Sequence, residues 1–89
     1  MYKVILKACG NIDHRENPFS NVVNGTRVND DIKEAETIDE LRVAVRDYIE
    51  RNHLGAGNWD GGQVFLKGKR VGYISYNGSY WEKGSKYYR

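Results

Sequence analysis

The chain has 89 residues, of which 39% are hydrophobic, 29% are charged and one is proline. This length suits one domain, and this composition excludes a disordered, collagen-like or disulfide-rich protein. The net charge of +2 conceals two opposed segments, because residues 30–50 hold eight acids and three bases whereas residues 63–89 hold six bases and one acid. We therefore expect one compact domain over residues 1–89 with oppositely charged ends.

No targeting or membrane segment is indicated. The apolar run at the start of the chain, within MYKVILKA, is too short and too interrupted for a signal sequence. No stretch approaches the roughly 20 apolar residues that a membrane span needs. Cys9 is the only cysteine, so no internal disulfide can form. These features predict a cytoplasmic, soluble protein without a membrane segment.

The first half of the chain contains a strand, a loop and a small hairpin. Residues 2–8 alternate in polarity, which predicts a strand whose buried side carries Tyr2, Val4, Leu6 and Ala8. Residues 10–20 are polar and contain Pro18, so we expect a loop there. Asn24-Gly25 lies between two short apolar arms and predicts a hairpin over residues 22–28, since both residues tolerate a positive φ.

A helix is expected from about Ile38 to about Leu54. Thr37 and Glu40 have the spacing of a capping box, in which each side chain satisfies a free amide of the first turn. Apolar residues recur at steps of three and four and form one stripe along the helix: Ile38, Leu41, Val45, Tyr48 and Ile49. Gly55 is expected to end the helix in the left-handed conformation.

Residues 63–82 predict a three-stranded meander with two-residue turns at Gly68-Lys69 and Asn77-Gly78. These turns pair Phe65 with Gly72 and Ile74 with Trp81. One face of the meander then suits packing beneath the helix: Val64, Leu66, Val71, Tyr73, Ser75 and Tyr80. The other face is richer in large rings and bases: Phe65, Gly72, Ile74, Tyr76, Trp81, Lys67 and Arg70. The expected fold class is α+β, an antiparallel sheet whose C-terminal meander packs against one α-helix.

The second, aromatic face of this meander has three interpretations. In the first, the N-terminal strand and residues 10–36 fold over this face, so that its side chains belong to the core. Alternatively it is a protein interface, where Tyr, Trp and Arg are enriched among anchors, or a surface on which bases stack. In the last two cases the binding residues are Arg70, Tyr76 and Trp81, with Lys83, Lys86, Tyr87 and Tyr88 at the rim. A homodimer joined through this face or through a sheet edge is a further option.

Catalytic chemistry is not indicated by the sequence. His14, His53 and Cys9 do not have metal-ligand spacing, and residues 13–16 are explained by a polar loop. The connector GAGNWDGG follows a helix and precedes a strand, which is the reverse of a phosphate-binding loop. Trp59 in this connector is expected to be buried. We expect no enzymatic activity, no metal and no cofactor.

Residues 61–64, 68–72 and 75–81 (GGQV, GKRVG and SYNGSYW) resemble the C-terminal meander of small phage and mobile-element proteins. Those are one-helix β-sheet domains that include anti-CRISPR inhibitors, and the resemblance covers roughly the last half of the chain, mostly as a turn pattern. It implies a non-enzymatic protein-binding module that occludes a surface of a bacterial host protein or nucleoprotein complex. The alternative is a small nucleic-acid-binding domain that uses the basic, aromatic meander.

Overall fold

Strand β1 (Tyr2–Leu6) lies in the interior of a five-stranded sheet with the order β4-β1-β5-β6-β7. The structure is a computed structural model, and it describes residues 1–84. The other strands of this sheet are β4 (Asp31–Ala35), β5 (Gln63–Leu66), β6 (Lys69–Ile74) and β7 (Tyr80–Glu82). Each neighbouring pair is antiparallel, so the sheet is antiparallel throughout.

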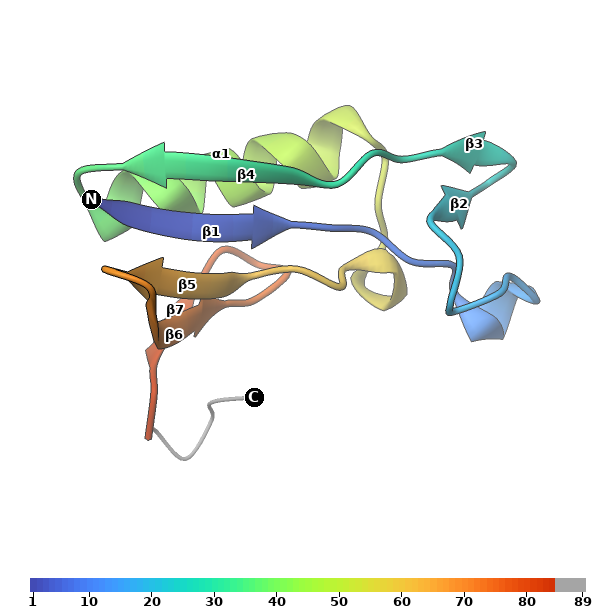
Figure 1. Cartoon of the computed structure of the whole chain (residues 1–89). Helices are drawn as coiled ribbons and strands as arrows, with labels where there is room; N and C mark the ends of the chain where they lie inside the picture. The colour runs from blue at the N-terminus through green and yellow to red at the C-terminus, as the bar shows by residue number, and fades with distance from the viewer. Residues whose placement is uncertain (85–89) are drawn as a thin grey trace.

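Helix α1 (Ile38–Arg51) covers one face of this sheet and lies behind β4 and β1 in the view of Figure 1. The predicted apolar stripe of the helix packs on alternate residues of the strands, since successive strand side chains point to opposite faces. The largest fully buried side chains come from both layers: Val4, Leu41, Val45, Ile49, Val64 and Ile74. The expected fold class, one helix on an antiparallel sheet with a C-terminal meander, is confirmed.

Helix α1 starts at the predicted residue, but the Glu40 carboxylate accepts from the Thr37 hydroxyl at 3.1 Å and not from the Thr37 amide, and the end of the helix is not as predicted. The hydroxyl of Thr37 accepts a hydrogen bond from the Glu40 amide at 3.2 Å, which satisfies one free donor of the first turn. At the other end His53, not Gly55, takes the left-handed conformation, with a φ of 54°. The amides of His53 and Leu54 donate to Glu50 O and Ile49 O, which is the Schellman arrangement. The prediction of a Gly55 cap was wrong.

Residues 12–27 and the connector between α1 and β5 contain smaller elements that lie toward one end of the sheet (Figure 1). A 3-10 turn, η1 (Ile12–His14), precedes the hairpin of β2 (Val22–Val23) and β3 (Thr26–Arg27). The predicted turn at Asn24-Gly25 is confirmed, because both residues have positive φ values of 51° and 79°. A second 3-10 turn, η2 (Ala56–Asn58), lies in the connector between α1 and β5.

Strand β4 was not predicted. It pairs along its length with β1, and four of its five residues are exposed. Its sequence, DIKEA, contains one large apolar residue and three charges, so it lacks the apolar alternation from which a strand is predicted. Charged residues of this kind are typical of edge strands, where they oppose pairing with another chain. The chain therefore contains one more strand of the main sheet than its hydrophobic pattern indicates.

Both predicted turns of the meander were wrong by one residue. The first turn is Lys67-Gly68, with φ values of 52° and 78°, and it pairs Leu66 with Lys69. A β-bulge then shifts the register, so that Phe65 pairs with Arg70 while Val64 pairs with Gly72. The second loop has three residues, 76–78, because Ser75 N donates to Ser79 O and Gly78 takes a φ of 89°.

These shifts exchange the faces of β6 at Gly72, Tyr73 and Ile74, whereas Tyr80 and Trp81 of β7 keep the faces predicted for them. Ile74 is fully buried beneath α1, although it was predicted on the open face. Tyr73 pairs with Trp81 on the open face, although it was predicted beneath the helix. Tyr80, not Phe65, shields Gly72, where a Cβ would lie 2.4 Å from the Tyr80 hydroxyl.

No helix within residues 1–84 is long and apolar enough to cross a membrane.

Candidate functional site

The face of the sheet opposite α1 carries five apolar and aromatic side chains, which we call the outer face: Ile5, Ile32, Phe65, Tyr73 and Trp81. Ile32 pairs with Ile5 across β4 and β1, and Tyr73 pairs with Trp81 across β6 and β7. Ile32 is 57% exposed and the other four are half-buried. The outer face thus extends across all five strands.

In the described part of the chain, nothing lies over the outer face at β4, β1 and β5. In Figure 1 no segment of residues 1–84 passes in front of β4, β1 and β5. The prediction that the N-terminal strand and residues 10–36 fold over the aromatic face was therefore wrong. The strand β1 and residues 31–35 lie in the sheet itself, and residues 10–28 lie beyond its end.

The hairpin loop between β6 and β7 is fixed by two arginines of α1. Arg42 donates through Nε to Gly78 O at 2.8 Å, and Arg46 donates through Nη1 to Tyr76 O. The Arg46 guanidinium also lies 5.2 Å from the centre of the Tyr76 ring, within cation–π range. The Tyr76 hydroxyl donates to Leu54 O at 3.1 Å. Tyr76, predicted as a binding anchor, therefore also joins this loop to Arg46 of α1 and to Leu54, which follows the helix.

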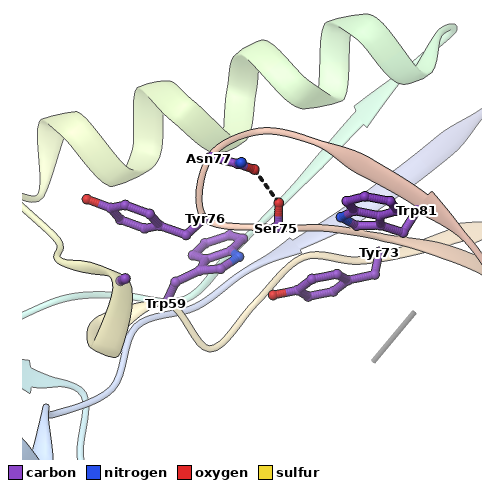
Figure 2. Close-up of a pocket in the computed structure, with 7 residues that line it drawn as sticks. Trp59, Tyr73, Ser75, Tyr76, Asn77 and Trp81 are labelled. Carbon is purple, nitrogen blue, oxygen red and sulfur yellow. Dashed lines mark hydrogen bonds between the residues drawn. The ribbon is translucent and has the colours of Figure 1, made fainter. Parts of the chain in front are cut away.

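A groove of about 460 Å³ opens beside this loop. Figure 2 shows Trp59 and Tyr76 on one side of it, Tyr73 and Trp81 on the other, and Ser75 between them. Ala56 of η2 and Asn77 complete the lining. Two outer-face residues, Tyr73 and Trp81, thus form one wall of the groove, so the groove continues the outer face.

Trp59 is buried, as its sequence position predicted. Its indole N–H donates to Ile74 O at 3.1 Å, and its ring lies 6.1 Å from the ring of Tyr48. Trp59 also forms a β-bridge with Ala8, which extends the sheet by one residue pair. These contacts hold Trp59, and with it one side of the groove, against the core.

The other predicted binding residues lie apart from one another. Arg70 is half-buried on β6 opposite Phe65, at the turn end of the sheet. Lys83 has an exposed side chain, and its amide donates to Val71 O at 3.0 Å. Trp81 lines the groove. Lys86, Tyr87 and Tyr88 lie outside the described residues.

The sequence predictions missed Tyr73, Ile5 and Ile32 as members of the candidate surface. The alternation of residues 2–8 already placed Ile5 opposite the buried side, and this signal was sufficient to find it. Ile32 belongs to the unpredicted strand β4. Tyr73 could be assigned to the outer face only with the correct register of β6, which the turn residues alone did not predict.

The polar loop at residues 10–25 is organised by one carboxylate. Glu16 accepts hydrogen bonds from the amides of Asn11 at 3.0 Å and Asn24 at 2.6 Å, and from the side chain of Asn58 at 3.4 Å. The two backbone hydrogen bonds lower the pKa of Glu16 from its ordinary value, since they favour its charged form. The loop presents Phe19 to solvent with 96% of its surface exposed. Glu16 thus holds the loop in shape, a role that needs no acid–base chemistry.

The environments of Cys9 and Tyr48 are also structural. Burial raises the pKa of the Cys9 thiol, which opposes formation of a reactive thiolate. Burial likewise raises the pKa of Tyr48 to about 12, and its hydroxyl donates to Asn29 O at 2.7 Å. Within residues 1–84 no group of three or more His, Cys, Asp or Glu side chains is placed to hold a metal ion.

Comparison with known proteins found no matching family model, no matching curated protein and no matching solved structure.

Proposed function

We propose that the chain is a non-enzymatic protein-binding module that contacts its partner through the outer face. The observation that supports this most strongly is the set of partly exposed apolar and aromatic side chains on the face of the sheet opposite α1, among which Lys3, Glu34 and Arg70 also lie. Exposed apolar surface bordered by polar residues usually marks an interaction site. Trp81 and Tyr73 are paired across β7 and β6, and aromatic residues are typical of those that dominate interface energies.

The partner class that we propose is a bacterial host protein or nucleoprotein complex, in particular a CRISPR-type defence complex. The support for this partner is the resemblance of residues 61–64, 68–72 and 75–81, in sequence, to small phage and mobile-element inhibitors. Such a module acts by occluding a surface, so it needs an exposed, preformed face and no catalytic group.

Phage infection of CRISPR-immune bacteria tests this proposal. Cells with an active defence system that targets the phage are transformed with the wild-type chain or with a variant, and plaques are counted. We expect the wild-type chain to restore plaques in at least one system of a panel of CRISPR types. Ile32→Lys and Phe65→Ala should abolish this effect, because both remove apolar contact area from the outer face.

Val43→Lys provides the matched control. Val43 is 71% exposed on α1, on the opposite side of the molecule from the outer face. We expect this variant to restore plaques like the wild-type chain. The proposal fails if no system in the panel is inhibited, or if the outer-face variants remain folded by circular dichroism and inhibit as well as the wild type.

A second candidate function, nucleic-acid binding, is favoured by the charge of the same region. Residues 61–81 contain no acid and include Lys67, Lys69 and Arg70, and aromatic rings on a sheet can stack on bases. Binding to single-stranded DNA should then weaken linearly with salt on logarithmic axes, because bound counterions are released. Absence of retention on DNA or heparin at low salt would remove this candidate. An aromatic protein interface should depend far less on salt.

A further inference from the structure

The dipeptide Asn-Gly occurs twice in the chain, each time in a hairpin loop and each time followed by a hydroxyl residue: Asn24-Gly25-Thr26 and Asn77-Gly78-Ser79. An asparagine that precedes glycine can lose its side-chain amide without an enzyme. Glycine has no Cβ that would keep its backbone nitrogen away from the side-chain carbonyl carbon of the asparagine. Because the two segments have nearly the same local sequence, a difference in their reactivity has to come from the surrounding structure.

The segment at Asn77 is held by hydrogen bonds on both of its reacting groups. The side-chain oxygen of Asn77 accepts from Ser75 Oγ and from the Ser79 amide, which fixes the carboxamide (Figure 2). The Gly78 amide, which would be the attacking group, donates to Ser75 O at 2.9 Å. Gly78 is also buried against Arg46, whose Cγ would lie 3.1 Å from a Cβ at this position. A reaction at Asn77 therefore requires the loop to give up these contacts first.

The segment at Asn24 has no such restraint on its reacting groups. Asn24 and Gly25 are exposed, and a Cβ at Gly25 would have no atom within 4 Å. Within residues 1–84 the Asn24 carboxamide makes no hydrogen bond, and the Gly25 amide donates none of the loop and turn hydrogen bonds. The one contact that holds this residue is made by the backbone amide of Asn24, which donates to Glu16 Oε2 at 2.6 Å. This contact leaves the carboxamide and the Gly25 amide free to react.

The hairpin that carries Asn24 also opens at little cost in free energy. Strands β2 and β3 have two residues each and pair only with each other. A two-stranded hairpin of this kind is marginally stable, and short exposed segments open locally far more often than the core. Asn24 itself has a φ of 51°, in the left-handed region that is unfavourable for a residue with a Cβ. Its backbone thus loses little when it turns toward the geometry of attack.

We infer that Asn24 is a site of spontaneous covalent modification and that Asn77 is protected from the same reaction. The Gly25 amide nitrogen loses its proton to solvent and attacks Cγ of Asn24. The new N–Cγ bond closes a succinimide ring, the bond between Cγ and Nδ2 breaks, and ammonia leaves with a proton taken from solvent. Water then opens the ring at either carbonyl, which gives aspartate or isoaspartate at residue 24. Water is the only co-reactant, and nothing is oxidised or reduced.

This modification changes the polar loop that Glu16 organises. A carboxylate formed at residue 24 lies beside the Glu16 carboxylate, to which the Asn24 amide already donates, and like charges at close range repel. Isoaspartate also adds one carbon to the main chain of a two-residue turn, whose geometry depends on its length. Both products should therefore weaken the hydrogen bonds that Glu16 accepts from the amides of Asn11 and residue 24.

Incubation of the purified chain at neutral pH and physiological temperature tests this inference. Peptide mapping by mass spectrometry follows the replacement of the amide by an acid at each asparagine over several weeks. We expect Asn24 to react at least about 10-fold faster than Asn77, because the hydrogen bonds around Asn77 have to break before its reaction. In denaturing urea the two asparagines should react at similar rates, since their local sequences match.

Three variants separate the reaction from its effect on the loop. Ser75→Ala removes one donor to the Asn77 carboxamide, so it should speed the reaction at Asn77 and leave that at Asn24 unchanged. Asn24→Gln has a side chain one carbon longer, for which ring closure is much slower, and residue 24 should then stay unmodified. Asn24→Asp carries the charge of the products, so the Asn11 amide should exchange its hydrogen faster than in the wild type. Asn24→Gln is the uncharged control and should exchange like the wild type.

Equal rates at Asn24 and Asn77 in the folded chain would overturn the inference. So would the absence of reaction at Asn24 over a period in which both asparagines react in urea. Unchanged hydrogen exchange at Asn11 in Asn24→Asp would overturn the inferred effect on the loop.

Discussion

His53 occupies a conformation that costs free energy for any residue with a side chain. Its φ of 54° at the end of α1 lies in the left-handed region, where glycine is the usual choice. His53→Gly should therefore raise the free energy of unfolding by about 0.5–1 kcal/mol, since His53 is exposed and its side chain makes no hydrogen bond within residues 1–84. Urea unfolding checks this. Asn52→Gly is the matched control and should destabilise, because the φ of Asn52 is −100°.

Glu16 makes the free energy of unfolding depend on pH in the acidic range. Its folded pKa is lowered mainly by the amide hydrogen bonds of Asn11 and Asn24, so its contribution is fully present above the unfolded pKa, near 4.5. That contribution is lost as the pH falls through the folded pKa. The wild type should therefore lose more stability between about pH 6 and about pH 3 than Glu16→Gln, whose side chain does not titrate. Equal losses in urea-unfolding midpoints would show that the Glu16 contacts do not contribute.

At the scale of elements, α1 stabilises the β6–β7 hairpin through polar contacts of its arginines in addition to apolar packing. Arg46 donates to Tyr76 O and lies on the Tyr76 ring, and both contacts are half-buried. Arg46→Ala should therefore lower the free energy of unfolding by about 1–2 kcal/mol. Arg51→Ala, which loses only an exposed pair with Asp47, should change it by less than about 0.5 kcal/mol. Chemical denaturation of both variants compares the two directly.

The elements that the sequence predicted correctly are those whose signal is local. The Thr37 cap and the Asn24-Gly25 turn each depend on a few adjacent residues, and both were found. The prediction of the β6–β7 loop was wrong because the Asn77 side chain accepts a hydrogen bond from the Ser79 amide. This contact favours a three-residue loop over the two-residue turn that Asn-Gly usually forms. Lys67 likewise takes a positive φ that a sequence pattern would assign to glycine.

The elements that the sequence did not predict depend on their neighbours. Strand β4 forms because β1 offers it a partner, while its own residues are mostly exposed and charged. The residues of the candidate site likewise divide into those that their own residue type indicates and those that depend on neighbouring strands. Trp81 was predicted from its residue type, whereas Tyr73 entered the site only through a register set by a β-bulge.

At the scale of the whole molecule, the sheet should be most stable at its centre. Strand β1 is hydrogen-bonded on both sides, and its inward residues Val4 and Leu6 are buried, whereas β4 has one free edge. Amide hydrogen exchange should therefore be slowest in β1 and β5 and distinctly faster at the outward-facing amides of β4. Mass-spectrometric or NMR exchange measures this. Equal protection of both edges of β4 would indicate that a second copy pairs with it, and light scattering would then show a doubled mass.

The position of β1 also determines when the protein can fold during its synthesis. Strand β1 is made well before β5, whose residues 63–66 are one of its two pairing partners. The central pairing of the sheet cannot close until most of the chain has left the ribosome, and such long-range pairing is slow. Until then only β4 and α1 can contact β1, so the apolar side of residues 2–8 is incompletely covered on the nascent chain.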